Sequence, residues 1–104
     1  MAITSNPTVQ NGAVSVGNGT HSFLNISATT AVKSTSGRIV TVNVLVAGST
    51  IGAIWDSATV AGRADANKVA IIPEAVGTYV FNFPCANGIV IGTGTDQVVS
   101  VSFN

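Results

Sequence analysis

Valine alternates with other residues between residues 37 and 47 more regularly than anywhere else in the chain. It recurs at every second position, at Val40, Val42, Val44 and Val46, while Thr41 and Asn43 stand between. Successive side chains of a strand point to opposite faces, so this period of two predicts a β-strand whose valine face turns towards a core. The other strands of the chain are expected to pack against it.

Shorter apolar runs precede and follow this strand, separated by Gly, Asn and Pro. Between residues 22 and 35, Leu24, Ile26 and Ala28 share one predicted face. Later runs place together Ile51, Ala53 and Trp55, then the buried run 69–72, then Tyr79, Phe81 and Phe83, then 89–91, and finally Val99, Val101 and Phe103. Seven or eight strands at spacings of about 8 to 12 residues predict an all-β chain. We expect a single domain folded as an antiparallel β-sandwich of jelly-roll-like form.

Two segments depart from the strand pattern. Residues 1–21 are rich in Asn, Gly, Ser and Thr, and are either a flexible, frayed end or a docking N-terminal arm that pairs with a sheet edge. The β-sandwich domain is therefore expected over residues 22–104. The stretch 57–68 is rich in Ala, opens with Ser57 as an N-cap residue, and predicts an exposed connection between two sheets with one or two helical turns.

The composition supports the strand prediction and adds an unusual surface. Val (16) and Ile (9) far outnumber Leu (2), as β-sheets favour. Charged residues make up 8% of the chain and the net charge is zero, where about 25% charged residues is ordinary. Such a surface is poorly protected against association. We therefore favour a subunit covered by neighbours over a monomer coated in Ser, Thr and Asn.

The same counts exclude several partners. Four basic residues spread along the chain do not neutralise a run of phosphates, so no nucleic acid is expected. No apolar run approaches the roughly 18 residues of a membrane span, and no signal peptide is evident at the N-terminus.

The single cysteine, Cys85, excludes an internal disulfide. The sequons at Asn18 and Asn25 are interpreted as turn and strand residues.

Few residues have the chemistry of a catalytic site. His21 is the one histidine and Cys85 is expected to be a buried structural thiol, although a Cys–His nucleophile pair stays open. Asp56, Asp65 and Asp96 are scattered, with no calcium-loop or acid/base spacing. Gly92-Thr93-Gly94 is interpreted as a turn. We therefore expect a non-enzyme, with no catalytic, cofactor-binding or metal-binding residues and no cofactor.

Two aromatic residues are candidates for binding. Trp55 is expected in the core, with a contact anchor at an interface as the alternative. Trp55 and Tyr79 are also the candidates for a receptor-binding or carbohydrate-binding module, which needs exposed aromatic side chains and polar loops.

Several runs of strand and turn residues together resemble a known group of proteins. They are Gly37–Val44, Gly52–Thr59, Ile71–Pro73, Phe83–Cys85, Gly88–Ile91 and Gly94–Val101. Across about residues 30–104, this order resembles small structural virion proteins of tailed bacteriophages. The resemblance implies an accessory component of the particle and supplies no catalytic residues.

The resemblance leads to one preferred function and several alternatives. The preferred function is a capsid decoration (cement) protein, made in the host cytoplasm and located in the virion, that binds the capsid surface and stabilises the particle. The expected partners are the major capsid protein or other virion proteins, and copies of the chain in a homo-oligomer such as a trimer. The alternatives are a neck, tail or fibre component, or the receptor-binding or carbohydrate-binding module.

Overall fold

The computed structural model describes residues 19–104, where the chain forms eight strands in two four-stranded antiparallel sheets. The strands are β1 (His21–Ile26), β2 (Thr30–Lys33), β3 (Gly37–Val46), β4 (Gly52–Trp55), β5 (Lys68–Ile72), β6 (Gly77–Cys85), β7 (Ile89–Gly92) and β8 (Val98–Phe103). The predicted N-terminal arm, residues 1–21, lies outside the described residues up to position 18. Its last residue, His21, pairs with Phe103 as the first residue of β1.

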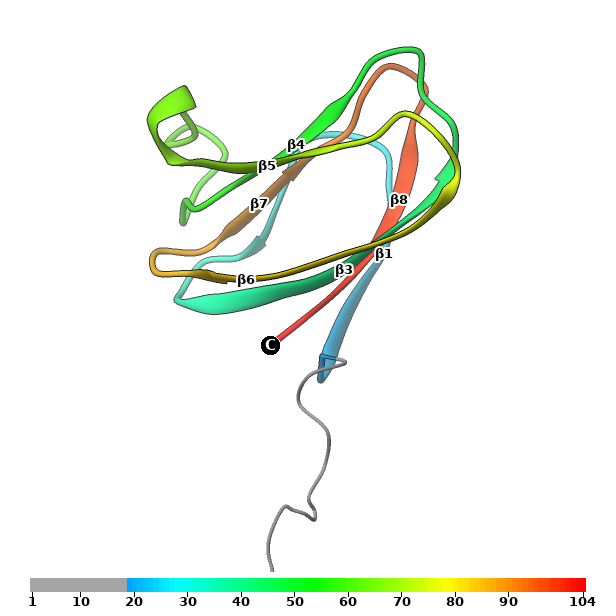
Figure 1. Cartoon of the computed structure of the whole chain (residues 1–104). Coiled ribbons are helices and arrows are strands. Elements are labelled where there is room, and N and C mark those ends of the chain that lie inside the picture. Colours follow the sequence, from blue (N-terminus) through cyan, green and yellow to red (C-terminus); the bar gives the residue numbers. More distant parts are fainter. Residues whose placement is uncertain (1–18) are drawn as a thin grey trace, which may run out of the picture.

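The strand order within each sheet defines the fold. One sheet has the order β1-β8-β3-β6 and the other β2-β7-β4-β5, and the two sheets lie as facing layers (Figure 1). Apart from the β4–β5 connection, each loop carries the chain from one sheet to the other. This is the order of an eight-stranded jelly roll. The predicted all-β antiparallel β-sandwich with jelly-roll form is therefore confirmed.

The core lies between the sheets, and β3 crosses its centre. Val42 and Val44 are at most 2% exposed and join a cluster of buried Ile, Val and Phe side chains. Val42 faces Val101 of β8 on one side and Tyr79 of β6 on the other. The predicted valine face does not extend to Val46, which is 49% exposed because the register with β8 shifts between Val44 and Val46.

Two other predicted faces differ from the structure. In β1, Leu24 is 67% exposed and only Ile26 is buried, because a register shift after Phe23 and a positive φ of 59° at Asn25 break the alternation. Strand β5 was expected to be buried, but it is the outer strand of its sheet and only Ile72 is buried in it.

The aromatic strand β6 follows its prediction only in part. Tyr79 and Phe81 pack against the core, whereas Phe83 is 46% exposed. A positive φ of 49° at Asn82 coincides with a register shift against β3, which explains why the period of two fails there. The connection between β4 and β5 is mostly exposed and contains one short 3-10 helix, η2 (Asp65–Asn67). It joins two paired strands of one sheet, so the prediction that it links two sheets is wrong. Within residues 19–104 no helix has the length and apolarity to cross a bilayer.

Candidate functional site

His21 and Cys85 do not form a nucleophile pair. They lie on β1 and β6, the two opposite edges of one sheet, with β8 and β3 between them. At a spacing of about 4.8 Å per strand, three steps separate them by roughly 14 Å. The ring of His21 instead lies 5.6 Å from that of Phe103.

Cys85 is the buried thiol that its sequence context predicts. It is 1% exposed and its Sγ lies 3.9 Å from the carbonyl oxygen of Phe83. Burial, followed by the charge of Asp56, raises the pKa of the Cys85 thiol, and a backbone hydrogen bond at Ile39 lowers it, so that the pKa stands at about 11. The group is therefore a protonated, weakly nucleophilic thiol at neutral pH.

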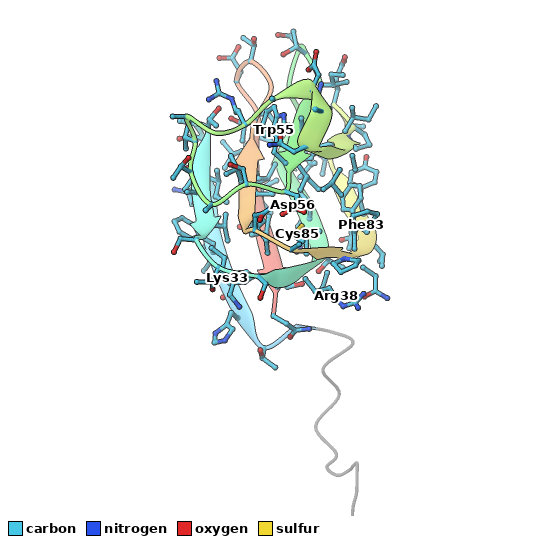
Figure 2. All side chains as sticks on the ribbon, turned by 90° about the vertical axis from the view of Figure 1, so that its left-hand side faces the viewer. Lys33, Arg38, Trp55, Asp56, Phe83 and Cys85 are labelled. Carbon is cyan, nitrogen blue, oxygen red and sulfur yellow. The ribbon has the colours of Figure 1, made fainter. Side chains whose placement is uncertain are left out.

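Asp56 has a structural role at the end of the sandwich where the β6–β7 turn follows Cys85. Its carboxylate accepts backbone N–H bonds from Ala86 (3.0 Å), Asn87 (2.7 Å) and Gly88 (3.4 Å), so it holds the β6–β7 turn closed. Figure 2 looks onto this end and shows Asp56 and Cys85 near its centre. The Asp56 carboxylate, which accepts three N–H groups, therefore stabilises the fold.

The remaining titratable residues do not converge. In the described part of the chain, no three His, Cys, Asp or Glu side chains are placed to hold a metal ion. Asp65, Glu74 and Asp96 lie in three different loops. The segment 92–94 ends β7 and enters a turn closed by reciprocal bonds between Gly94 and Gln97, in the loop that carries the chain from one sheet to the other.

A hollow of about 630 Å³ opens at the end of the sandwich that Figure 2 faces. Its polar side chains already bond to the protein itself. Lys33 Nζ donates to the carbonyl of Asn104 at 3.1 Å, and Arg38 Nη1 donates to the carbonyl of Asn82 at 3.0 Å. The first bond joins the two sheets and the second joins the neighbouring strands β3 and β6, so these side chains stabilise the fold.

The outer face of the β1-β8-β3-β6 sheet is broad and uncharged. One row of paired residues crosses all four strands: Ser22, Ser102, Thr41 and Val80. A second row contains Ser100, Asn43 and Thr78, and Thr41 and Ser102 share a short hydrogen bond between their hydroxyls. The only charged residue in these four strands is Arg38, near the start of β3.

The outer face of the other sheet has a different character. A groove of about 320 Å³ runs across β7, β4 and β5, and Trp55 lies in it rather than in the core cluster. The prediction that Trp55 lies in the core is therefore wrong. The ring is half-buried, and the guanidinium Cζ of Arg63 stands 5.6 Å from its centroid.

The roles of two residues in this groove were not predicted from the sequence. Gly92 backs the tryptophan ring, and Arg63 reaches it from the β4–β5 connection. The glycine at the end of an apolar strand is a signal of close approach that was available in the sequence. The position of Arg63 follows from the path of the connection, which residue patterns do not give.

Comparison with known proteins finds no family model, no curated protein and no solved structure that matches this chain.

Proposed function

We propose that this chain is a structural virion protein of a tailed bacteriophage, a capsid decoration (cement) protein that binds the capsid surface and stabilises the particle. The single observation that carries the proposal is the uncharged outer face of the β1-β8-β3-β6 sheet. The resemblance to small bacteriophage virion proteins supplies the kind of particle.

The uncharged face has the properties of a surface that a neighbour covers. Charged residues are depleted from the centres of protein interfaces, and this face consists of Ser, Thr and Asn with exposed apolar side chains at Leu45 (52%) and Val80 (71%). A flat hydroxyl-rich face can form many hydrogen bonds with a partner while burying no unpaired charge. We propose that it contacts the major capsid protein, another virion protein or another copy of this chain.

The distribution of charge along the sandwich fits the same proposal. Glu74 and Asp96 lie in loops at one end, and the other six charged residues lie at or near the opposite end: Lys33, Arg38, Asp56, Arg63, Asp65 and Lys68. The charged side chains at the two ends favour solubility of the domain, while the broad face stays free of charge. The jelly roll itself supports the proposal only weakly, because this fold serves in viral capsids, lectins and unrelated enzymes alike.

The experiment is sedimentation of the purified chain with capsids of its own phage that lack it, followed by a measurement of capsid stability to heat. We expect the wild-type chain to sediment with the capsids and to raise their disruption temperature. Asn43→Lys places a charge in the middle of the uncharged face, and we expect it to lower binding at least about tenfold. Ala61→Lys, which adds the same charge in the exposed β4–β5 connection, is the matched control.

Binding that survives Asn43→Lys, or that falls equally with Ala61→Lys, contradicts this assignment of the contact face. A wild-type chain that remains monomeric and does not bind capsids contradicts decoration itself. Binding to purified necks or tails in place of capsids supports the alternative of a neck, tail or fibre component.

A further inference from the structure

The groove on the outer face of the β2-β7-β4-β5 sheet has a flat floor set by the strand register. Ala53 of β4 pairs with Gly92 of β7 on one side and Ile71 of β5 on the other, which places three small or apolar residues in one row. Trp55 occupies the next outward position of β4, and its benzene edge lies over Gly92, where a Cβ would stand 2.6 Å from Cζ3. The centre of the groove is therefore apolar and level.

The two ends of the groove differ in chemistry. Arg63 and Lys68 line one end, whereas no carboxylate lines the groove. Lys68 is paired with the fully exposed Asp65 at 3.6 Å, the only ion pair within residues 19–104. Arg63 donates one bond to the carbonyl of Val60 at 2.8 Å. Because Asp65 offsets the charge of Lys68, Arg63 is the cation at this end that can pair with an anionic group of a ligand.

The opposite end of the groove is polar and neutral. Thr29 and Thr93 line it, beside the exposed side chain of Ile51. Threonine hydroxyls both donate and accept hydrogen bonds, so they match ligand hydroxyl groups. The complete groove thus has a cationic end, an aromatic and apolar centre, and a hydroxyl-bearing end.

We propose that this groove binds an acidic saccharide, a pyranose ring that carries a carboxylate. The apolar C–H face of such a ring packs on the apolar floor of the groove and on the part of the Trp55 ring beside Arg63, whose Cζ lies 5.6 Å from the ring centroid. Its carboxylate pairs with Arg63, and its hydroxyls reach the threonine end. The volume of about 320 Å³ lies at the lower end of the roughly 300–1,000 Å³ found for small-molecule sites and fits about one or two sugar rings. Charge complementarity selects an acidic sugar over a neutral one.

The proposal goes beyond capsid decoration and is tested on the free chain. Trp55 is the only tryptophan, so its fluorescence reports occupation of the groove directly. The purified protein is titrated with D-glucuronate and N-acetylneuraminate, with D-glucose as the neutral probe, and each titration is repeated by calorimetry. We expect a saturable change with at least one acidic sugar and binding weaker by about tenfold or more with glucose.

Variants assign the response to the groove. Arg63→Ala is expected to weaken binding of the acidic sugar by about tenfold. Arg38→Ala removes the same charge at a position outside the groove and is expected to leave binding unchanged. The proposal is overturned if neither acid gives a saturable signal, if glucose binds equally well, or if Arg63→Ala binds like the wild type. Saturable binding of adenosine monophosphate without binding of either acidic sugar would also overturn it, in favour of a nucleotide.

These outcomes are independent of particle binding. Asn43→Lys lies on the other sheet, so it is expected to retain sugar binding while it loses capsid binding. Arg63→Ala is expected to show the reverse behaviour. Failure of one proposal can therefore be told apart from failure of the other.

Discussion

The indole ring of Trp55 lies directly against the backbone of Gly92. A Cβ atom at Gly92 would stand 2.6 Å from Cζ3 and 2.8 Å from Cη2 of the ring. Real Cβ atoms do not approach other heavy atoms so closely, so any side chain at position 92 must displace the tryptophan. This contact between β7 and β4 fixes Trp55, the only tryptophan of the chain, on the outer surface of the sandwich.

The first prediction concerns this contact. Gly92→Ala is expected to lower the free energy of unfolding by about 1 to 3 kcal/mol, because an added methyl group in a filled space strains its surroundings. The emission spectrum of Trp55 is expected to shift as the ring moves. In a Trp55→Leu background the same substitution is expected to cost much less, since the clashing ring is gone. Equal costs in the two backgrounds, measured by urea unfolding, would show that the contact is not the cause.

The second prediction concerns the turn that Asp56 closes. Asp56→Ala removes the acceptor of three backbone N–H groups and is expected to lower the free energy of unfolding by about 1 to 3 kcal/mol. Asp65→Ala, at a fully exposed position with only a weak ion pair, is the control and is expected to leave the urea midpoint unchanged. If both variants unfold at the wild-type midpoint, the β6–β7 turn does not depend on Asp56.

The third prediction concerns Cys85 and pH. Its thiol pKa is raised by burial from 9.0 to about 11, so the folded protein keeps the proton over a range where the unfolded chain loses it. The contribution of the protonated thiol to the free energy of unfolding is therefore fully present below about pH 9 and declines as the pH rises towards about 11. The stability difference between wild type and Cys85→Ala should shift by about 2 kcal/mol across this range, to the disadvantage of the wild type.

Urea unfolding at several pH values measures this shift. A difference between the two proteins that stays constant from about pH 8 to about pH 11 contradicts the raised pKa. Rapid reaction of the native thiol with Ellman's reagent near neutral pH contradicts it as well.

The fourth prediction compares neighbouring residues of β3 that face opposite sides. Val42→Asp is expected to unfold the domain, at a cost of more than about 4 kcal/mol, because Val42 is fully buried and a carboxylate there has no partner. Thr41→Asp, one residue away on the outer face, is expected to leave the protein folded. Circular dichroism and thermal unfolding distinguish the two. A folded Val42→Asp variant would mean that the valine face does not form the inner wall.

The fifth prediction concerns the N-terminal segment. The strands of the described fold begin at His21, so deletion of residues 1–18 is expected to leave the Tm unchanged. If the segment is a docking arm, the deletion also lowers binding to capsids. Loss of the fold on deletion would contradict the interpretation of this segment as a docking arm.

The sequence predicts the fold class because most strands of this chain alternate as a half-buried sheet requires. Val99, Val101 and Phe103 of β8 turn inwards, and the fully apolar run of β7 is buried, as the patterns indicate. Many strands joined by turns predict a sandwich. The jelly-roll order also requires the pairing of β1 with β8, which joins residues about 80 positions apart. Local patterns carry no information on such a pairing.

The failures of the sequence prediction have local physical causes. Backbone irregularities at Asn25 and Asn82, both with positive φ, interrupt the alternation of inward and outward residues in β1 and β6. Alternation also does not say which side of a strand is inward: the face that contains Ile51, Ala53 and Trp55 was identified as one face, but it lies on the outer side of its sheet. The groove depends on Arg63, which a long connection brings back to the sheet, and no residue spacing predicts that return.

The buried amide of Gln97 shows the same limit. It is 1% exposed, donates to the carbonyl of Pro73 at 2.8 Å and accepts from the N–H of Gly94 at 3.0 Å. A glutamine between two predicted elements is ordinarily a surface residue. Here it joins two loops at one end of the sandwich, a role that appears only when the sheets are assembled.

The most direct test of the central claim is the position of this chain in the mature particle, determined by cryo-electron microscopy of wild-type phage and of phage that lacks the chain. We expect difference density on the outer capsid surface, at symmetry-related positions, with the uncharged face of the β1-β8-β3-β6 sheet against a neighbouring subunit. Difference density confined to the neck, tail or fibres, or no difference between the two particles, would contradict it.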